Sequence, residues 1–506
     1  MARWIRHIAA ALALLMLVGF LACRFLLPER FAMNTPVLNT ILGRSGPALA
    51  EGAVGDRIQV ARGFAVSLYA EVPQVRVLCP TPAGDLLASV PRQGKVLLLR
   101  RDRNGDGRAD GQTTLLKGLD RPYGLAFLGR WLYVAEGSAV GRIRFDPQAG
   151  RVEGSLEPVV TGLPQGGNHW TRTLHFGPDG HMYLSVGSDC NVCLEQDERR
   201  AAILRFQPDG SEPEIYARGL RNAVGFDWRP GSHELYATDN GRDLMGDDTP
   251  PDELNLVVRG GDYGWPVANG DRVLDPDVGP GNEARAAAST PPVFHFRAHN
   301  APLGLRFLRH APQPAGYRGA ALATLHGSWN RTHKDGYKVV SLHWDAEGNI
   351  HAQDFLWGFL ENEDVIGRPV DVAEAHDGAI FISDDYSGSI FRVVADASGA
   401  APRGLDLASQ GGETRGDPLA TLSAEERLAG ASRGAALFER FSCADCHDTQ
   451  RAAKGVVAVP LRNLAARYDL PGLEGLLATP TPPMPAFPLS DAERRDLAIH
   501  LLSRFP

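Results

Sequence analysis

Residues 86–99, Leu-Leu-Ala-Ser-Val-Pro-Arg-Gln-Gly-Lys-Val-Leu-Leu-Leu, contain two apolar segments separated by a short turn with Pro and Gly. This pattern is typical of a pair of β-strands, because apolar residues fill both strands and Pro and Gly favour the turn. Similar units recur along the middle of the chain. We expect strand pairs at residues 86–90 and 96–99, 132–135 and 142–145, 182–186 and 203–206, 235–238 and 254–258, 321–325 and 339–344, and 380–383 and 390–394.

The spacing of these six units predicts the fold. Repeated all-β units of roughly 50 residues are typical of propeller blades, which are four-stranded sheets around a central channel. We therefore expect a mainly β chain with a six-bladed β-propeller over residues 60–396. The strand-like segment 63–72 would join the last blade and close the ring, and loops such as 276–292 would be insertions. Two separate β-sandwiches are the alternative, but no linker interrupts residues 60–396.

The ends of the chain have a different composition. Arg3 and Arg6 precede an apolar run from Ile8 to Cys23, which predicts a signal or anchor helix over residues 1–30, followed by a linker over 31–59. We expect an uncleaved anchor in the inner membrane with the rest of the chain in the periplasm, and a cleaved signal is the alternative. The net charge of −8, with no basic stripe, argues against a nucleic-acid partner.

The segment Cys443-Ala444-Asp445-Cys446-His447 matches the C-x-x-C-H pattern of covalent haem c attachment. Both thiols would bind the haem, and His447 would be one axial ligand of the iron. Met484, in a Pro-rich segment downstream, would be the second ligand, and His/Met ligation suits electron transfer. A disulfide or half of a zinc site is the alternative interpretation of these cysteines.

The residues around this motif predict a small domain. Residues 397–420 are rich in Ala, Ser, Gly and Pro, as in a linker. Ser423 and Ser490 are each followed three residues later by Glu, which is the capping-box pattern that begins a helix. Leu497, Leu501 and Phe505 would line the inner face of the last helix. We therefore expect an all-α class I cytochrome c domain over residues 421–506.

The other cysteines and one acidic loop allow further predictions. Cys190 and Cys193 would form a disulfide in an oxidising compartment, and Cys79 would be a small buried hydrophobic residue. The segment 102–110 places Asp102, Asn104, Asp106 and Asp110 at the spacing of the first half of a calcium loop. Thr113 replaces the Glu that would close such a loop, so a solvated hairpin turn is an equal alternative.

Three segments carry a resemblance to a known family. They are Gly166–Arg172, Gly219–Gly225, and a segment that starts at Thr238–Asp243 and continues through Asp252–Asn255 to Gly260–Pro266. The Arg221-Asn222 pair and the run from Asp252 to Pro266 are the most specific parts. Over residues 60–396 the chain resembles the soluble pyrroloquinoline-quinone (PQQ)-dependent sugar dehydrogenases of the glucose/sorbosone dehydrogenase family. The C-terminal haem motif resembles that of the sorbosone dehydrogenase-like members. No dinucleotide-binding fingerprint follows a strand, which argues against a nicotinamide cofactor.

The resemblance implies roles for individual residues. His169 would be the general base, Arg221 would contact the quinone and the reacting oxygen, and Asn222 would be its polar neighbour. The backbone carbonyls of Gly241 and Arg242 would hold a Ca²⁺ ion. The other residues expected to bind PQQ are Asn168, Arg331 and Arg368, with Lys338 as a competing candidate for the role of Arg331. The chain has Val370 where the family's glucose enzymes have a second arginine.

The function implied is that of a quinohaemoprotein dehydrogenase with PQQ, Ca²⁺ and haem c. It would oxidise a sugar, a sugar aldehyde or a related polyol. Its electrons would pass through the haem to a respiratory acceptor, which would be a cytochrome, an oxidase or the quinone pool. The alternative is a non-catalytic propeller that binds a sugar or a protein and carries a cytochrome c relay; such a module would need neither His169 nor Arg221.

Overall fold

The computed structural model describes residues 46–50, 52–345, 347–396, 418–447, 461, 464, 468–478 and 487–505. The chain divides into two compact units, Met1–Arg403 and Gly404–Pro506. The division falls inside the predicted linker. The predicted anchor at residues 1–30 lies outside the described residues, and within the described part no helix is long and apolar enough to cross a bilayer.

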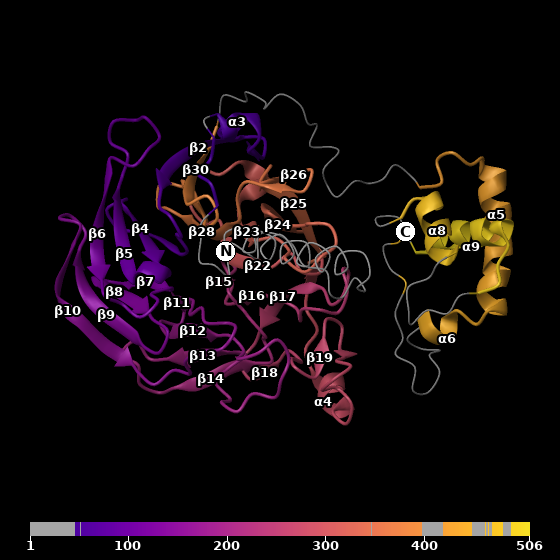
Figure 1. Cartoon of the computed structure of the whole chain (residues 1–506), viewed down its shortest axis with the longest axis horizontal. Coiled ribbons are helices and arrows are strands. Elements are labelled where there is room, and N and C mark those ends of the chain that lie inside the picture. The colour runs from indigo at the N-terminus through magenta and orange to yellow at the C-terminus, as the bar shows by residue number, and fades with distance from the viewer. Residues whose placement is uncertain are drawn as a thin grey trace, which may run out of the picture. The chain divides into compact units, whose positions relative to one another are not determined.

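In the first unit, six sheets of four or five strands are arranged in a ring (Figure 1). This arrangement confirms the predicted six-bladed propeller. From the inner strand outwards, the sheets are β3 (Leu78–Pro80), β4 (Leu86–Val90), β5 (Lys95–Arg100) and β6 (Gly111–Lys117); β7 (Leu125–Leu128), β8 (Trp131–Ala135), β9 (Val140–Asp146) and β10 (Arg151–Val160); β11 (Leu174–Phe176), β12 (Met182–Val186), β13 (Ala202–Phe206), β14 (Glu214–Arg218) and β18 (Gly261–Asp262); β15 (Phe226–Trp228), β16 (Leu235–Asp239), β17 (Asp252–Val257) and β21 (Phe294–Phe296); β22 (Pro302–Phe307), β23 (Ala321–Leu325), β24 (Lys338–Trp344), β25 (Ile350–Trp357) and β1 (Gln59–Val60); and β28 (Pro369–Glu374), β29 (Ile380–Asp384), β30 (Ser389–Ala395) and β2 (Phe64–Glu71).

The second and third strands of every blade are the strand pairs predicted from the sequence. The second strands β4, β12, β16, β23 and β29 are buried along their whole length. Continuous apolar runs, rather than alternating ones, occur where both faces of a strand are covered. Each second strand lies between the facing sheets of two neighbouring blades, which explains why these segments gave the clearest sequence signal.

The ring is closed by the N-terminal strands. β2 pairs with β30 in antiparallel register from Phe64 opposite Ala395 to Glu71 opposite Ser389, which confirms the closure predicted for residues 63–72. β1 begins within the predicted linker and adds a fifth strand to the blade of β25. The long interval before β23 contains α4 (Glu283–Ala288) and the hairpin of β19 (Ala268–Asn269) and β20 (Val273–Leu274), as the predicted insertion requires.

Replacing Phe64 by Ala tests this closure. The Phe64 ring is buried and packs edge-on against Tyr317 and Phe355 of the neighbouring blade. We expect Phe64→Ala to lower the free energy of unfolding by about 3 kcal/mol, because truncating a buried Phe removes apolar contacts and leaves a cavity. Chemical denaturation followed by circular dichroism measures this change. The matched control Ala65→Ser, at an exposed position of the same strand, should change stability by less than about 0.5 kcal/mol.

The described part of the second unit is helical and contains α5 (Ala424–Arg440), α6 (Ala444–His447), α8 (Leu470–Ala478) and α9 (Asp491–Arg504). Both predicted capping boxes are present, at Ser423 with Glu426 and at Ser490 with Glu493. Leu497 and Leu501 are buried in the core of this unit, and Phe505 packs against it.

The packing of α5 on α9 requires a glycine. A Cβ atom at Gly434 would lie 2.1 Å from the carbonyl oxygen of Asp496, so only glycine allows the two helices this close approach. The Arg433 guanidinium also donates two hydrogen bonds, of 2.7 and 2.8 Å, to the Asp496 carboxylate. These contacts hold α5, which leads to the C-x-x-C-H segment, against α9.

Candidate active site

One end of the propeller, here called the mouth, collects most of the predicted site residues. The inner strands of a propeller all run in the same direction, and each second strand is antiparallel to its inner strand. Residues just before an inner strand and residues just after a second strand therefore meet at the mouth. His169 precedes β11, Arg221 precedes β15 and Arg368 precedes β28. These residues are far apart in the sequence and are brought to the same end of the ring.

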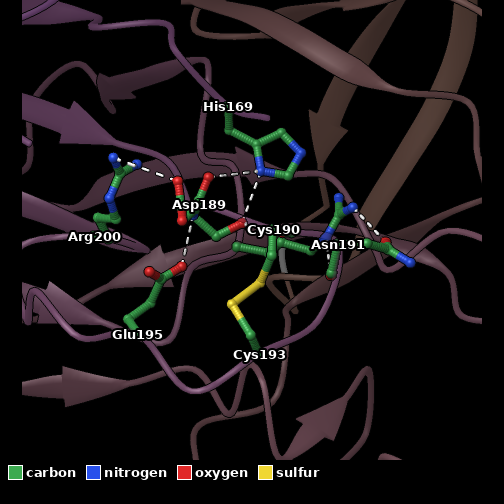
Figure 2. The surroundings of a disulfide bond; sticks show 9 residues. His169, Asp189, Cys190, Asn191, Cys193, Glu195 and Arg200 are labelled. Carbon is green, nitrogen blue, oxygen red and sulfur yellow. Dashed lines mark hydrogen bonds and ion pairs between the residues drawn. A yellow bond between two sulfur atoms is a disulfide. The ribbon is translucent and has the colours of Figure 1, made fainter. Parts of the chain in front are cut away.

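The His169 imidazole is held by the loop that follows β12 (Figure 2). Its Nδ1 lies 2.7 Å from Ser188 Oγ and 3.2 Å from the Ser188 carbonyl oxygen. The Ser188 hydroxyl donates its own proton to the Cys190 carbonyl at 2.8 Å. Because both Ser188 oxygens can then only accept at Nδ1, that nitrogen carries the ring proton in the neutral imidazole. The Nε2 atom therefore keeps a lone pair and can accept a proton.

Burial and the nearby Arg221 guanidinium hold the pKa of His169 well below its ordinary value of 6.5. Both effects disfavour the charged imidazolium. A histidine that acts as a base must be neutral, so this environment keeps His169 in the form that accepts protons down to acidic pH.

This shift predicts the pH dependence of turnover. Protonation of His169 removes the base, so kcat/KM should decrease as the pH falls through the pKa of His169. Because this pKa is lowered, the midpoint of the decrease should lie below pH 6.5. A profile of kcat/KM between pH 4 and pH 9 measures it. An acid limb at or above pH 6.5 would contradict the assignment of His169 as the neutral base.

The Arg221 guanidinium is buried and fixed by oxygen atoms. Its Nε donates to the Asn191 carbonyl at 2.9 Å, and Nη1 donates to the Asn240 carbonyl at 3.2 Å. Its Nη2 donates at 2.8 Å to Asn191 Oδ1 and, in an ion pair, to Asp243 Oδ2. Four of its five N–H groups are used within the described residues, which leaves one Nη1 hydrogen and a fixed positive charge for a ligand.

Asn222 and Asn168 are each held through their backbone N–H groups. The backbone N–H of Asn222 donates to Asp239 Oδ1 at 2.5 Å, and the backbone N–H of Asn168 donates to the Asp189 carbonyl at 2.8 Å. A Cβ atom at Gly187 would lie 2.4 Å from His169 Cβ and 2.9 Å from Asn222 Oδ1. The side chains of His169 and Asn222 therefore flank Gly187 directly, while Asn168 is exposed.

The loop after β16 contains the predicted calcium-binding carbonyls. Gly241 donates its amide to Asp252 Oδ1 at 2.7 Å, and the Arg242 guanidinium pairs with Asp275 at 2.5 Å. Among the described residues, no hydrogen-bond donor reaches the carbonyl oxygens of these two residues. Burial raises the pKa of Asp252 to about 7. A buried carboxyl bonded to this loop, together with carbonyl oxygens that no donor reaches among the described residues, makes a site where a cation is favourable.

Arg368 has a set of neighbours that the sequence did not indicate. Its Nε and Nη2 atoms donate at 3.2 Å to the carbonyls of His326 and Gly327. The His326 ring contacts Asp385 Oδ1 at 2.9 Å, and Arg76 Nη1 donates to Asp385 Oδ2 at 2.5 Å. Burial and Arg368 lower the pKa of His326 to about 4, so its ring is neutral at pH 7. Each of these residues precedes an inner strand or follows a second strand, and nothing in the local sequence marks Arg76 or Asp385.

Arg331 and Lys338 have other partners. Arg331 Nη1 donates to the carbonyls of Asp247 and Ala298, and Nη2 pairs with Asp248 at 3.2 Å. Lys338 pairs with Asp354 on the next strand at 2.6 Å. The structure thus commits most of the Arg331 guanidinium to the 247–248 loop, whereas the Lys338 ammonium is held by the outer strand β25.

Two buried amide side chains near the mouth lack partners among the described residues. Asn330 is 1% exposed, and neither its Oδ1 nor its Nδ2 is hydrogen-bonded; Asn240 Oδ1 is also buried without a donor. An unpaired buried polar atom costs free energy, so native structures rarely leave one without a partner. These atoms fit the polar groups of a ligand seated at the mouth.

The 102–110 loop is an exposed hydrogen-bonded turn. Asp102 accepts hydrogen bonds from the amides of Gly105 and Gly107 at 2.7 and 2.9 Å, and Asp110 accepts one from Arg103 at 3.2 Å. Asn104 and Asp106 accept from the amides two residues ahead. The carboxylates of Asp102, Asp106 and Asp110 do not all lie within 4.8 Å of one another. These bonds shape an exposed turn, and the calcium loop expected at these residues stays a prediction.

The predicted disulfide between Cys190 and Cys193 is present. It closes the loop between β12 and β13 that holds His169 and Arg221. The Glu195 carboxylate lies within 4.8 Å of both sulfur atoms. Cys79 is half-buried in the inner strand β3 and packs against an apolar cluster, and burial raises the pKa of its thiol to about 12.

The C-x-x-C-H segment occupies one helical turn. Cys443 is buried at the start of α6, and the His447 amide donates to the Cys443 carbonyl at 3.0 Å. One turn therefore brings residues 443 and 447 to the same side of the helix. The Cys446 side chain and Met484 lie outside the described residues, so haem ligation stays a prediction.

Fold and site together define a six-bladed propeller with a neutral imidazole and a fixed guanidinium at its mouth. The sequence model of the glucose/sorbosone dehydrogenase family matches residues 133–392, just over half of the chain. The chain belongs to this family.

Two curated relatives match only part of the chain, at 27% and 36% identity. An uncharacterised protein of Borreliella burgdorferi is 36% identical over 217 residues, which cover 42% of this chain and 56% of that protein. The pyrroloquinoline quinone-dependent pyranose dehydrogenase of Coprinopsis cinerea is 27% identical over 329 residues, covering 52% of this chain and 44% of that protein. The chain spans about half the length of these curated relatives.

A solved structure shares the fold. The calcium structure of the Trichoderma reesei carbohydrate-active enzyme of family AA12 superimposes with a TM-score of 0.59. It is 22% identical and covers 67% of this chain and 97% of its own. At this identity, the similarity shows the architecture alone.

Proposed function

We propose that this protein is a PQQ-dependent quinohaemoprotein dehydrogenase that oxidises a sugar, a sugar aldehyde or a related polyol. The observation that carries the proposal is the pair at the mouth, a His169 ring with an unprotonated Nε2 beside the fixed charge of Arg221. Membership of the glucose/sorbosone dehydrogenase family and the PQQ dependence named for the Coprinopsis relative support it.

The residues at the mouth fit PQQ, a flat quinone with three carboxylates. Arg76, Arg221 and Arg368 bring three guanidinium groups, and such groups bind carboxylates well. The buried amides of Asn330 and Asn240 offer polar atoms without partners among the described residues. These five residues would hold the quinone, with the remaining Nη1 hydrogen of Arg221 available to one of its oxygens.

PQQ, when bound, supplies a two-electron acceptor for the hydride that leaves the substrate carbon. His169 Nε2 would accept the proton of the substrate hydroxyl. As the ring becomes positive, its Nδ1–H remains bonded to Ser188, so the imidazole keeps its orientation. The Arg221 charge favours negative charge that develops on a nearby oxygen, and its fixed partners mean that it need not reorganise.

A Ca²⁺ ion fits the loop after β16. The carbonyls of Gly241 and Arg242 would be ligands, since hard cations prefer oxygen atoms. The buried Asp252 carboxyl, which accepts a hydrogen bond from the Gly241 amide, favours positive charge there, because a cation would lower its raised pKa.

The C-terminal unit would carry the electrons away. Cys443 and Cys446 would bind haem c, with His447 and Met484 as axial ligands, and the electrons would leave one at a time to a respiratory acceptor. An exported position, with the N-terminal segment anchored in the inner membrane, suits this role. A chain that holds dehydrogenase and relay together raises the effective concentration of the acceptor.

Reconstitution tests the proposal. We expect protein loaded with PQQ and Ca²⁺ to reduce an artificial dye when aldoses are added, and protein without PQQ to be inactive. Loaded protein that binds PQQ but oxidises no aldose, sugar aldehyde or polyol would instead support a non-catalytic binding propeller with a redox relay.

A further inference from the structure

The loop of residues 188–193, here called the disulfide loop, contacts both proposed catalytic side chains. Figure 2 shows Cys190, Asn191 and Cys193 of this loop near His169. Cys190 and Cys193 are joined, and Asn191 lies between them. On one side the loop reaches His169 through Ser188, and on the other it reaches Arg221 through Asn191. A single cross-linked turn therefore connects to the base and to the cation of the site.

The connection to His169 runs through the backbone of a cysteine. The Cys190 carbonyl accepts the Ser188 hydroxyl proton at 2.8 Å. This bond turns the hydroxyl so that its lone pair faces His169 Nδ1 at 2.7 Å. Movement of Cys190 would free the Ser188 hydroxyl to donate as well as accept, and only the Ser188 carbonyl at 3.2 Å would then hold Nδ1 as a donor, so the ring tautomer would be less firmly fixed.

The connection to Arg221 uses both oxygens of Asn191. The Asn191 carbonyl accepts from Arg221 Nε, and Asn191 Oδ1 accepts from Arg221 Nη2. Asn191 Oδ1 also accepts from the Asp243 amide at 2.9 Å, and Asn191 Nδ2 donates to the Asp243 carbonyl at 3.1 Å. Asn191 thus orients Arg221 together with its ion-pair partner.

The disulfide is not needed to hold the blade together. β12 and β13 pair without interruption from Met182 opposite Phe206 to Val186 opposite Ala202. The cross-link lies in the connection beyond these strands, and both cysteines are half-exposed, so a dissolved reductant can reach them. The loop that it cross-links holds His169 and Arg221.

We propose that Cys190–Cys193 is a reversible redox modification site that sets the activity of the mouth. The inference rests on the proposed function, because it assigns a regulatory role to residues that position His169 and Arg221. The oxidised loop holds both side chains, and the reduced loop releases Asn191 and Ser188.

The chemical step is thiol–disulfide exchange with a dithiol reductant. A thiolate of the reductant attacks one sulfur and forms a mixed disulfide, while the other cysteine leaves as a thiolate and takes up a proton. The second thiol of the reductant then releases the first cysteine. In total two electrons and two protons pass from the dithiol to the protein, and the reductant becomes a cyclic disulfide.

The test compares oxidised and reduced protein in a Cys79→Ala background, in which Cys190 and Cys193 are the thiols of the propeller. The reduced protein is trapped with iodoacetamide, freed of reductant and checked by mass spectrometry. Hydrogen exchange of the protein without quinone reports on the loop directly, through peptides that cover residues 187–195, 219–224 and 240–245. We expect faster exchange in these peptides on reduction and no change in residues 86–100 of another blade.

Turnover is then measured after loading with PQQ and Ca²⁺. We expect reduction to lower kcat by about tenfold or more with little change in KM, because misplacement of groups that act in the transition state lowers the rate of the chemical step. Reoxidation of an untrapped sample should restore kcat. The Cys190→Ser/Cys193→Ser double variant should match the reduced protein and ignore the reductant.

The outcomes are distinct. Unchanged exchange on reduction, or faster exchange with unchanged kcat, overturns the proposal. If the oxidised protein oxidises no sugar but reduction still speeds exchange in the three peptides, the disulfide loop acts as described and the dehydrogenase function fails.

Discussion

The His169→Ala variant should lose about a thousandfold in kcat while still binding PQQ with nearly unchanged affinity. A positioned general base contributes roughly 10²- to 10⁴-fold to a rate, and His169 Nε2 is unprotonated at the mouth of the propeller. The quinone would be held mainly by guanidinium groups, which this change leaves in place. Steady-state dye reduction gives kcat, and quenching of tryptophan fluorescence gives the affinity for PQQ.

His233→Ala is the matched control. His233 is exposed and precedes the second strand β16, so it lies at the opposite end of the propeller. Its removal should leave kcat unchanged. If His169→Ala retained more than about a tenth of wild-type kcat, the assignment of His169 as the base would be wrong.

The Arg221→Lys variant should lose about a hundredfold in kcat, although the charge is kept. Removing one preorganised donor that stabilises developing charge costs roughly 10²- to 10³-fold. Arg221 contacts Asn191, Asn240 and Asp243 with a rigid planar group, and a lysine ammonium cannot reproduce that geometry. The loss should appear mainly in kcat, since the ground-state complex keeps a cation at this position.

Arg229→Lys provides the comparison for this change. Arg229 follows the inner strand β15 and therefore lies at the end opposite the mouth, where it is partly exposed. Its replacement should leave the kinetic constants unaltered. Equal kcat values in Arg221→Lys and wild-type protein would show that the planar guanidinium geometry of residue 221 has no part in the reaction.

Much of the fold could be predicted because its signals are local. The strands β4, β12 and β29 are apolar runs buried on both faces, and each precedes a strand that is apolar in turn. The capping boxes of α5 and α9 are set by residues three apart. The Cys190–Cys193 pair is equally local. Each of these features depends on neighbours in the sequence.

The inner strands and the contacts at the mouth were not predictable in the same way. β3, β11 and β15 are three residues long, too short for a periodic pattern. The contact of Arg76 with Asp385 joins residues 309 positions apart. Ser188 and Asn191 are ordinary polar residues in the sequence, and their importance comes only from the side chains that the blades bring to them.

A single turnover without added acceptor tests the central claim most directly. Protein loaded with PQQ and Ca²⁺ is mixed with a panel of aldoses, sugar aldehydes and polyols in a stopped-flow instrument, and the haem absorbance is followed. We predict that at least one of these compounds reduces the haem in wild-type protein and in His233→Ala, and none does so in His169→Ala. A haem that dithionite reduces fully, but that no compound in the panel reduces in wild-type protein, would contradict the account.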